Sequence, residues 1–200
     1  YRHNGRLTQF LHYSDDKGAS WSPRITVAES PALHLCEVSM LPLGGGTVVG
    51  FLRENSAQGW DCKKVISHDN GETWGPIVDF PIPACHRPTA GLLQDGRVLI
   101  TCRLMQGGKG WLGAWTQNLL AVLTDRESVL ADSRSGSRVR ILPVDYDRSP
   151  FADTGYSGWV QFPDGGIYIV NYIVDDAYDK AQIRGYSLSL NDFILPEKEN

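Results

Sequence analysis

An eight-residue turn sequence occurs twice in this 200-residue chain and strongly limits what it can fold into. Residues 14–21 read SDDKGASW and residues 67–74 read SHDNGETW, so both follow the pattern S-x-D-x-G-x-[ST]-W. The Asp carboxylate can accept backbone N–H groups of the turn, the Gly supplies a positive φ, and the Trp folds back to bury its face. Short alternating stretches flank each octet. The repeat therefore predicts a tight turn between two antiparallel strands, used more than once.

A second repeat consists of two apolar strands around a glycine turn, and it occurs three times. The segments are residues 37–53 around Gly45-Gly46, residues 87–103 around Asp95-Gly96 and residues 156–172 around Asp164-Gly165. Asp-Gly between alternating apolar runs is a strong hairpin signal. Superposing the three turns gives two sets of equivalent positions. The first set is Glu37, Arg87 and Tyr156, and the second is Arg53, Arg103 and Tyr172.

The two repeats together define a unit of a hairpin, a third strand, an octet turn and a fourth strand, which is typical of a propeller blade. We therefore predict an all-β chain, a partial β-propeller with about three blades. Residues 1–30 end one blade, residues 31–82 form a blade, residues 83–148 form a blade with an insertion, and residues 149–200 form a last, incomplete blade. Closed propellers typically have four to eight blades, so we expect a missing N-terminal half or self-association to complete the ring.

The insertion in the third unit allows two interpretations. Residues 119–123 and 138–144 can form its third and fourth strands around a degenerate turn at residues 124–126. A helix over residues 119–131 is the alternative.

Charge and hydropathy exclude several classes of function. The chain has 23 acidic and 19 basic side chains, a net charge of -4, which argues against nucleic-acid binding through phosphate neutralisation. No uninterrupted apolar run approaches the roughly 20 residues needed to span a bilayer. The chain starts at Tyr1 without a leader, which indicates a processed or excised protein. Its compartment cannot be read from the sequence, and we favour a secreted or periplasmic location over the cytoplasm.

No cofactor or metal site is expected. The four cysteines are Cys36, Cys62, Cys85 and Cys102. They include no C-x-x-C pair and no histidine at zinc-finger spacing, so we expect buried reduced thiols, with a single disulfide as the alternative. Residues 108–113 fit G-x-G-x-x-G but lack a strand before and a helix after them, and we expect a loop there.

The equivalent hairpin positions carry the candidate chemistry. First strands line the axis of a propeller, so Glu37, Arg87 and Tyr156 should converge there. Arg53 and Arg103 end the paired strands and should lie on the same face. Guanidinium forks suit a ligand carboxylate, and a phenol, with an unperturbed pKa of about 10, can attack when a neighbouring Glu takes its proton. The structural alternative is that the arginines tie carboxylates such as Glu54, and that the Glu and Tyr only satisfy packing.

These motifs resemble the sialidase superfamily. The octets are similar to its Asp-box. Residues 36–39 (CEVS), followed by a glycine hairpin and FLR ending at Arg53, resemble the stretch that supplies sialidases with a catalytic Glu and a carboxylate-binding Arg. Residues 155–158 (GYSG), ahead of FPDG, resemble the segment with the nucleophilic Tyr. The resemblance covers nearly the whole chain, as the C-terminal half of a six-bladed catalytic domain.

The resemblance implies a mechanism. Tyr156 would attack the anomeric carbon of a sialic acid with Glu37 as its base, giving retaining hydrolysis of terminal sialic acid from glycoconjugates. Arg53 and a second arginine would clamp the sugar carboxylate. The family's first arginine and its acid/base aspartate have no counterpart in these residues, so this chain alone should be inactive.

Other members of the substrate-binding set follow from position. Arg103 or Arg87 would complete the clamp, and His86 adjoins Arg87 beside the axis. The expected partner is a sialylated or other acidic glycan. The alternatives are another glycosidase or a lyase on the same propeller, and a non-catalytic propeller that binds glycans or proteins.

Overall fold

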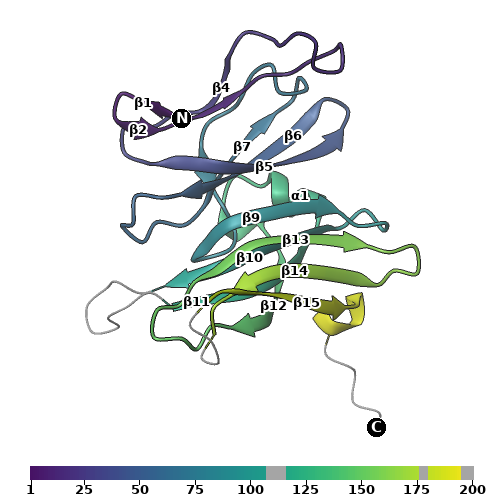
Figure 1. The fold of residues 1–200 in the computed structure, drawn as a ribbon. Coiled ribbons are helices and arrows are strands. Elements are labelled where there is room, and N and C mark those ends of the chain that lie inside the picture. Colours follow the sequence, from purple (N-terminus) through teal and green to yellow (C-terminus); the bar gives the residue numbers. More distant parts are fainter. Residues whose placement is uncertain (107–115, 176–179, 195–200) are drawn as a thin grey trace.

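The computed structural model describes residues 1–106, 116–175 and 180–194, and their regular secondary structure is almost entirely antiparallel strand (Figure 1). The glycine motif at residues 108–113 lies outside the described residues. None of the described helices is long and apolar enough to cross a membrane.

The strands form five sheets that follow one another along the chain. Two small hairpins come first: β1 (Arg2–His3) with β2 (Arg6–Leu7), and β3 (Gln9–Leu11) with β4 (Ile25–Ala28). The next sheet contains β5 (Leu35–Gly44), β6 (Thr47–Glu54), β7 (Lys63–Ser67) and β8 (Val78–Asp79). The fourth contains β9 (Cys85–Leu92), β10 (Val98–Gln106), β11 (Thr116–Thr124) and β12 (Val139–Tyr146). The last contains β13 (Thr154–Gln161), β14 (Ile167–Ile173) and β15 (Gln182–Leu188).

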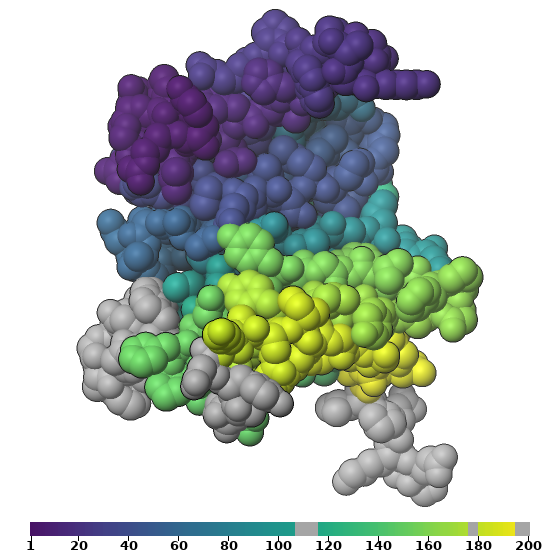
Figure 2. Space-filling model, viewed as in Figure 1, coloured from purple at the N-terminus to yellow at the C-terminus, as the bar shows by residue number. Residues whose placement is uncertain are grey.

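The sheets are arranged as the blades of a partial β-propeller. In each of the three larger sheets, strands adjacent in sequence pair antiparallel. Their first strands, β5, β9 and β13, lie side by side, and the sheets follow chain order from purple to yellow (Figures 1 and 2). The described sheets do not close into a ring. The prediction of an all-β, partial propeller is confirmed.

Three apolar clusters hold consecutive sheets together. One lies between the β5–β8 and β9–β12 sheets and contains Phe51, Phe80 and Ile100. Another joins the β9–β12 sheet to the last one, and the third joins β4 to the β5–β8 sheet. Because both faces of an inner sheet are covered, residues 98–103 of the middle strand β10 are all buried, and most of them are apolar. Fully burying each such side chain contributes about 1.5–3 kcal/mol.

The insertion in the third unit is mainly strand. β11 runs through Thr124 and pairs with both β10 and β12, as the strand interpretation predicted. The alternative, a helix over residues 119–131, is wrong for its first part, because residues 119–124 belong to β11 and their apolar side chains fill the two inter-sheet cores. The connection contains a short helix, α1 (Arg126–Leu130), whose N-cap Asp125 accepts from the Ser128 N–H. Two 3₁₀ turns, Arg134–Gly136 and Leu190–Phe193, complete the helical elements of the described chain.

Each octet forms the predicted turn. Asp69 accepts hydrogen bonds from the Thr73 backbone N–H at 2.9 Å and from the Ser67 and Thr73 hydroxyls. These bonds, the Thr73 hydroxyl first, lower the pKa of Asp69 to about 2. Gly71 has φ 92°. The first octet has the same hydrogen bonds around Asp16.

The octet tryptophans differ from one another. Trp74 donates to the Gly71 carbonyl at 3.1 Å and packs against Gly50, as expected. Trp21 is 64% exposed, so the expectation that it buries its face is wrong. The reason is that its sheet has two described strands, β3 and β4, and provides no further strand for the indole to cover.

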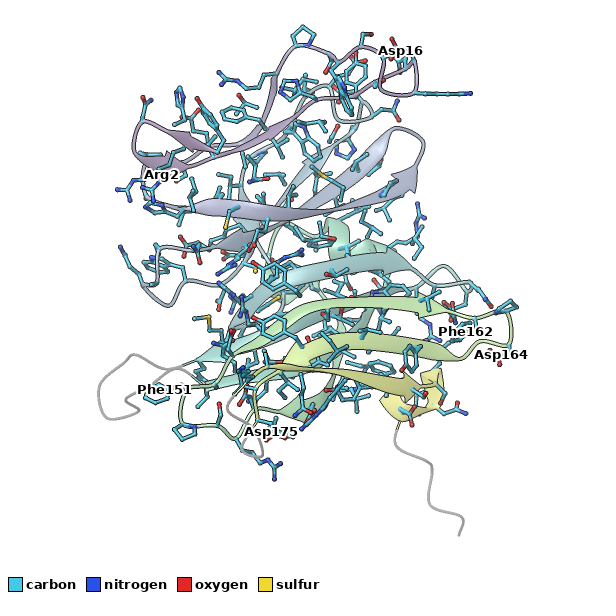
Figure 3. All side chains as sticks on the ribbon, viewed as in Figure 1. Arg2, Asp16, Phe151, Phe162, Asp164 and Asp175 are labelled. Carbon is cyan, nitrogen blue, oxygen red and sulfur yellow. The ribbon has the colours of Figure 1, made fainter. Side chains whose placement is uncertain are left out.

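The octet turns and the hairpin turns share one end of the sheets. The Asn70 N–H donates to the Gly46 carbonyl at 2.8 Å, which joins the two kinds of turn within one blade. Figure 3 shows Asp16, Phe162 and Asp164 toward this end, and Phe151 and Asp175 toward the other. The candidate site residues therefore belong to the end opposite the octets.

The four cysteines are free. Three are buried and Cys36 is half-buried, and burial raises the pKa of the Cys36 thiol to about 11. The expectation of reduced, packed thiols is confirmed, and the disulfide alternative is not.

Gly91 in β9 provides a test of how the last two sheets pack. A Cβ at this position would lie 2.6 Å from Cζ2 of Trp159 in β13. We predict that Gly91→Ala lowers the free energy of unfolding by about 1–3 kcal/mol, because the indole cannot move without disturbing the strand that carries Tyr156. The measurement is the urea midpoint of the intact protein.

The control is Gly158→Ala on β13, where a Cβ would meet nothing within 4 Å. This variant should leave the midpoint nearly unchanged. Equal midpoints for both variants would contradict the packing described between β9 and β13.

Candidate functional site

The same β-bulge occurs at the start of β5, β9 and β13. In β5, Cys36 pairs with Arg53 and Ser39 with Phe51, so two residues of β5 lie opposite one of β6. The register shifts in the same way in the other two hairpins. The first bulged residue is Glu37 in β5, Arg87 in β9 and Tyr156 in β13. Their φ angles are 45°, 55° and 52°.

These three residues adopt a backbone conformation that non-glycine residues rarely take. Each such residue costs on the order of 1–3 kcal/mol, and such strain clusters at functional sites. A bulge also re-aims the side chain of its strand. Glu37, Arg87 and Tyr156 therefore converge, as the superposed turns predicted. The β-bulge that the three strands share places them there.

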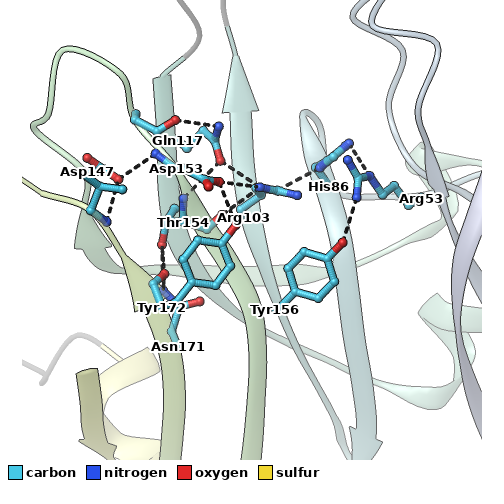
Figure 4. Close-up of polar contacts among 12 residues, drawn as sticks. Arg53, His86, Arg103, Gln117, Asp147, Asp153, Thr154, Tyr156, Asn171 and Tyr172 are labelled. Carbon is cyan, nitrogen blue, oxygen red and sulfur yellow. Dashed lines mark hydrogen bonds and ion pairs between the residues drawn. The ribbon is translucent and has the colours of Figure 1, made fainter. Parts of the chain in front are cut away.

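Glu37, Tyr156 and Arg53 contact one another directly. The Tyr156 hydroxyl donates to Oε1 of Glu37, and Nη1 of Arg53 donates to Oε2 of the same carboxylate. Nη1 of Arg53 also lies 3.3 Å from the Tyr156 hydroxyl (Figure 4). The Tyr156 side chain is open to solvent, with 48% of the residue exposed. A ligand can therefore reach the hydroxyl.

The surroundings set the protonation states of this pair. Burial would raise the pKa of Glu37, but the hydrogen bonds from Tyr156 and Arg53 and the charges of Arg53 and Arg87 outweigh it and lower the pKa. The hydrogen bond to Glu37, followed by burial, raises the pKa of Tyr156. At neutral pH the pair therefore consists of a carboxylate that can accept a proton and a phenol that can lose one.

His86 lies between two guanidinium groups. Nε of Arg53 is 2.8 Å from its Nε2, and Nε of Arg103 is 2.9 Å from its Nδ1. Burial, and then the charges of Arg53 and Arg103, lower the pKa of His86 to about 3. A neutral imidazole has one acceptor nitrogen, so only one guanidinium at a time can donate to it. His86 therefore connects the two arginines without adding a charge.

Arg103 is buried, and its Nε and Nη1 contact protein groups. It is 5% exposed. Its Nη1 donates to Oε1 of Gln117 and to the Thr154 carbonyl, both at 2.9 Å, and lies 3.5 Å from Asp153 (Figure 4). Arg103 therefore anchors the start of β13, directly before Tyr156.

Tyr172 lies against the nucleophile candidate. Its ring stacks on the Tyr156 ring with centroids 6.1 Å apart, and its hydroxyl donates to Asp153 at 2.7 Å. Burial, followed by this hydrogen bond, raises the pKa of Tyr172 to about 12.

Arg87 is placed differently from the other two arginines. Its Cζ lies 4.8 Å from the centre of the Tyr156 ring. Its Nη1 is 3.4 Å from the carbonyl of the adjacent Pro88, and its Nε is buried without a partner among the described residues.

The structure thus brings all six candidate residues into one cluster. Of the structural alternative, one part holds: Arg53 does tie a carboxylate on the paired strand, that of Glu37, whereas Glu54 accepts from the His34 and Ser56 N–H groups. Gln117 and Asp153 belong to the cluster and were missed. No sequence repeat marks Gln117, and Asp153 lies in the connection before the third hairpin.

Among the described residues, no group of three or more His, Cys, Asp or Glu side chains is arranged to hold a metal ion.

No protein-family model and no curated protein matches the sequence. Solved structures match the fold. A protein of unknown function from Dyadobacter fermentans has a TM-score of 0.71 at 23% identity, over 90% of this chain and 44% of that one. The intramolecular trans-sialidase from Ruminococcus gnavus has a TM-score of 0.61 at 16% identity, over 92% and 39%. The α-L-arabinanase from Penicillium chrysogenum has a TM-score of 0.53 at 16% identity, over 86% and 52%.

At these identities the comparisons show a shared propeller fold. The chain spans about half or less of each of the three proteins.

The low pKa of His86 can be measured. We predict that its ring stays neutral down to about pH 4 and titrates near 3, because the folded site disfavours the imidazolium. Protonation in the unfolded chain begins near pH 6.5, so His86 should reduce stability progressively as the pH falls from 6.5 toward 3. The measurement is the pH dependence of its ring resonances by NMR.

Removing one neighbouring charge provides the control. Arg53→Met should raise the pKa of His86, because the charge of Arg53 contributes to the shift. A His86 titration near 6.5 in the unaltered protein would contradict the arrangement.

Proposed function

We propose that this chain carries the nucleophile, the base and part of the substrate clamp of a retaining exo-glycosidase that releases terminal sialic acid. The observation that carries the proposal is the hydrogen bond from the Tyr156 hydroxyl to the Glu37 carboxylate. Nη1 of Arg53 contacts both of these groups. A phenol beside an ionised carboxylate is an activated nucleophile. The Ruminococcus gnavus neighbour, an intramolecular trans-sialidase, supports this choice of chemistry.

The first step forms a glycosyl-enzyme. The Tyr156 oxygen attacks the anomeric carbon while its proton passes to Glu37, and the glycosidic C–O bond breaks with its electron pair on the leaving oxygen. The leaving oxygen takes a proton from a general acid. The resemblance assigns this acid to an aspartate with no counterpart in residues 1–200.

The second step releases the sugar. A water oxygen attacks the anomeric carbon, the bond to Tyr156 breaks, and Glu37 returns its proton to the phenolate. The acid of the first step takes the proton of the water, as a retaining pathway requires. Two displacements at one carbon keep its configuration.

The choice of nucleophile fits an anionic sugar. A carboxylate nucleophile would repel the carboxylate of a sialic acid, whereas a neutral phenol does not. Three guanidiniums, two carboxylates and a neutral imidazole form the cluster, so it carries an excess of positive charge. This charge favours an acidic glycan over a neutral arabinoside, the type of substrate named for the Penicillium neighbour.

Substitution of the two reacting groups tests the proposal. In the intact protein, Tyr156→Phe should lower kcat/KM for a fluorogenic sialic acid glycoside by about a thousandfold or more, because it removes the attacking oxygen. Glu37→Gln should lower it by roughly a hundredfold to ten-thousandfold, the usual contribution of a general base.

Tyr168→Phe is the matched control, because Tyr168 lies on β14 without a contact to the cluster and is 39% exposed. It should leave kcat/KM unchanged. Turnover of only neutral glycosides by the intact protein would support the alternative glycosidase. Glycan binding that survives Tyr156→Phe, in a protein without turnover, would support a binding propeller.

A further inference from the structure

We infer that Arg87 is a positioning residue whose guanidinium acts through the ring of Tyr156 and stabilises the phenolate that leaves the sugar in the second step. The inference rests on the proposed function, because it concerns the nucleophile of that reaction. The group on which Arg87 acts belongs to the protein, so this role is distinct from binding of the substrate.

The second step places negative charge on Tyr156. When the bond between the anomeric carbon and the Tyr156 oxygen breaks, its electron pair stays on that oxygen until Glu37 returns the proton. The resting site opposes this charge, because the hydrogen bond to Glu37, followed by burial, raises the pKa of Tyr156. A cation placed against the phenol would therefore speed the step in which the phenolate leaves.

Two arginines near Tyr156 have carboxylates beside them. Nη1 of Arg53 lies 3.3 Å from the Tyr156 hydroxyl, but the same guanidinium pairs with Glu37. Arg103 lies farther away, with its Cζ 5.9 Å from the ring centre, and its Nη1 is 3.5 Å from Asp153. Both cations therefore supply only part of their charge to the phenolate.

Arg87 has no such carboxylate partner. Among the described residues, no carboxylate forms an ion pair with it. Its Cζ is 4.8 Å from the centre of the Tyr156 ring, within the range of a cation–π contact. Its one hydrogen bond is a 3.4 Å contact to the carbonyl of the adjacent Pro88, and its buried Nε has no acceptor. The Tyr156 ring is therefore the main partner of this guanidinium.

The attraction between Arg87 and Tyr156 grows during the reaction. Over a neutral phenol, the guanidinium interacts only with the quadrupole of the ring. A phenolate spreads a full negative charge into the ring, so the same guanidinium then faces an opposite charge. An interaction that strengthens on the way to the transition state accelerates the step.

The fold holds the ring and the guanidinium together before any ligand binds. Arg87 and Tyr156 occupy equivalent bulges of β9 and β13, with φ of 55° and 52°. The Tyr172 ring stacks on the Tyr156 ring with an interplanar angle of 27°, which limits its rotation (Figure 4). Backbone strain of this kind persists where it positions a functional group.

The first test measures the ionisation of residue 156 without a substrate. In the intact protein, Tyr156 is replaced by difluorotyrosine, whose phenol ionises nearer neutral pH, and its titration is followed by fluorine NMR. Arg87→Met should raise the pKa of this phenol, because it removes the positive charge over the ring. Arg87→Lys should restore most of the effect, since Lys keeps the charge. Arg97→Met is the matched control and should change nothing, because Arg97 pairs with Asp95 at a hairpin turn.

The second test separates action on the nucleophile from binding of the substrate. With a fluorogenic sialic acid glycoside, Arg87→Met should lower kcat by about tenfold or more without raising KM, because it slows departure of the phenolate and leaves substrate binding intact. Arg87→Lys should recover part of the lost kcat, and Arg97→Met should retain all of it.

Two results would overturn the inference. One is a titration of residue 156 that Arg87→Met leaves unchanged, and the other is a rise in KM at unchanged kcat, which would make Arg87 a substrate-binding residue. If Arg87→Met does not fold, Arg87→Asn takes its place, because Asn tolerates a positive φ.

Failure of the proposed function gives a different result. An intact protein without turnover of sialic acid glycosides, or a Tyr156→Phe variant with full activity, would refute that function. The titration of residue 156 needs no substrate, so it still decides whether Arg87 stabilises the phenolate.

Discussion

The left-handed backbone at residues 37, 87 and 156 determines the rest of the site. In a regular strand, successive side chains alternate between the two faces, so the first strand of a blade could not aim a residue along the axis by pleating alone. The bulge inserts one residue, and pairing resumes beyond it, as between Ser39 and Phe51. Because three blades share this bulge, a carboxylate, a guanidinium and a phenol lie at equivalent positions of the three first strands. Burial of both faces of the middle strands offsets the backbone strain.

The ladder partners of the residues before each bulge form a second row of functional side chains. Arg53 pairs with Cys36, Arg103 with His86 and Tyr172 with Gly155. The two guanidiniums of this row would repel one another, and the neutral imidazole of His86 between them adds no third positive charge and accepts a hydrogen bond from one of them at a time. Burial keeps His86 uncharged. The net charge of the site therefore depends on the burial of this histidine as well as on the charges of the arginines.

The sequence predicted the elements that local chemistry specifies. Glycine turns fixed the register of the hairpins, so the equivalence of Glu37, Arg87 and Tyr156 followed from counting. The bulges could not be predicted, because a positive φ at Glu, Arg or Tyr has no sequence signature. The burial of Arg103 by Gln117 and Asp153 depends on how two sheets pack, which the repeat does not encode. Likewise Trp21 and Trp74 share a motif, but their burial depends on the strands that surround them.

A double-mutant cycle on Glu37 and Tyr156 tests the central claim, that these two residues share one proton in the reaction. The quantity is kcat/KM of the intact protein for a fluorogenic sialic acid glycoside, for Glu37→Gln, Tyr156→Phe and both together. If the two act as one unit, the double variant loses no more activity than the more damaging single variant, because the base has no function without the hydroxyl. Losses that multiply would show that the two side chains act independently, and would contradict the account.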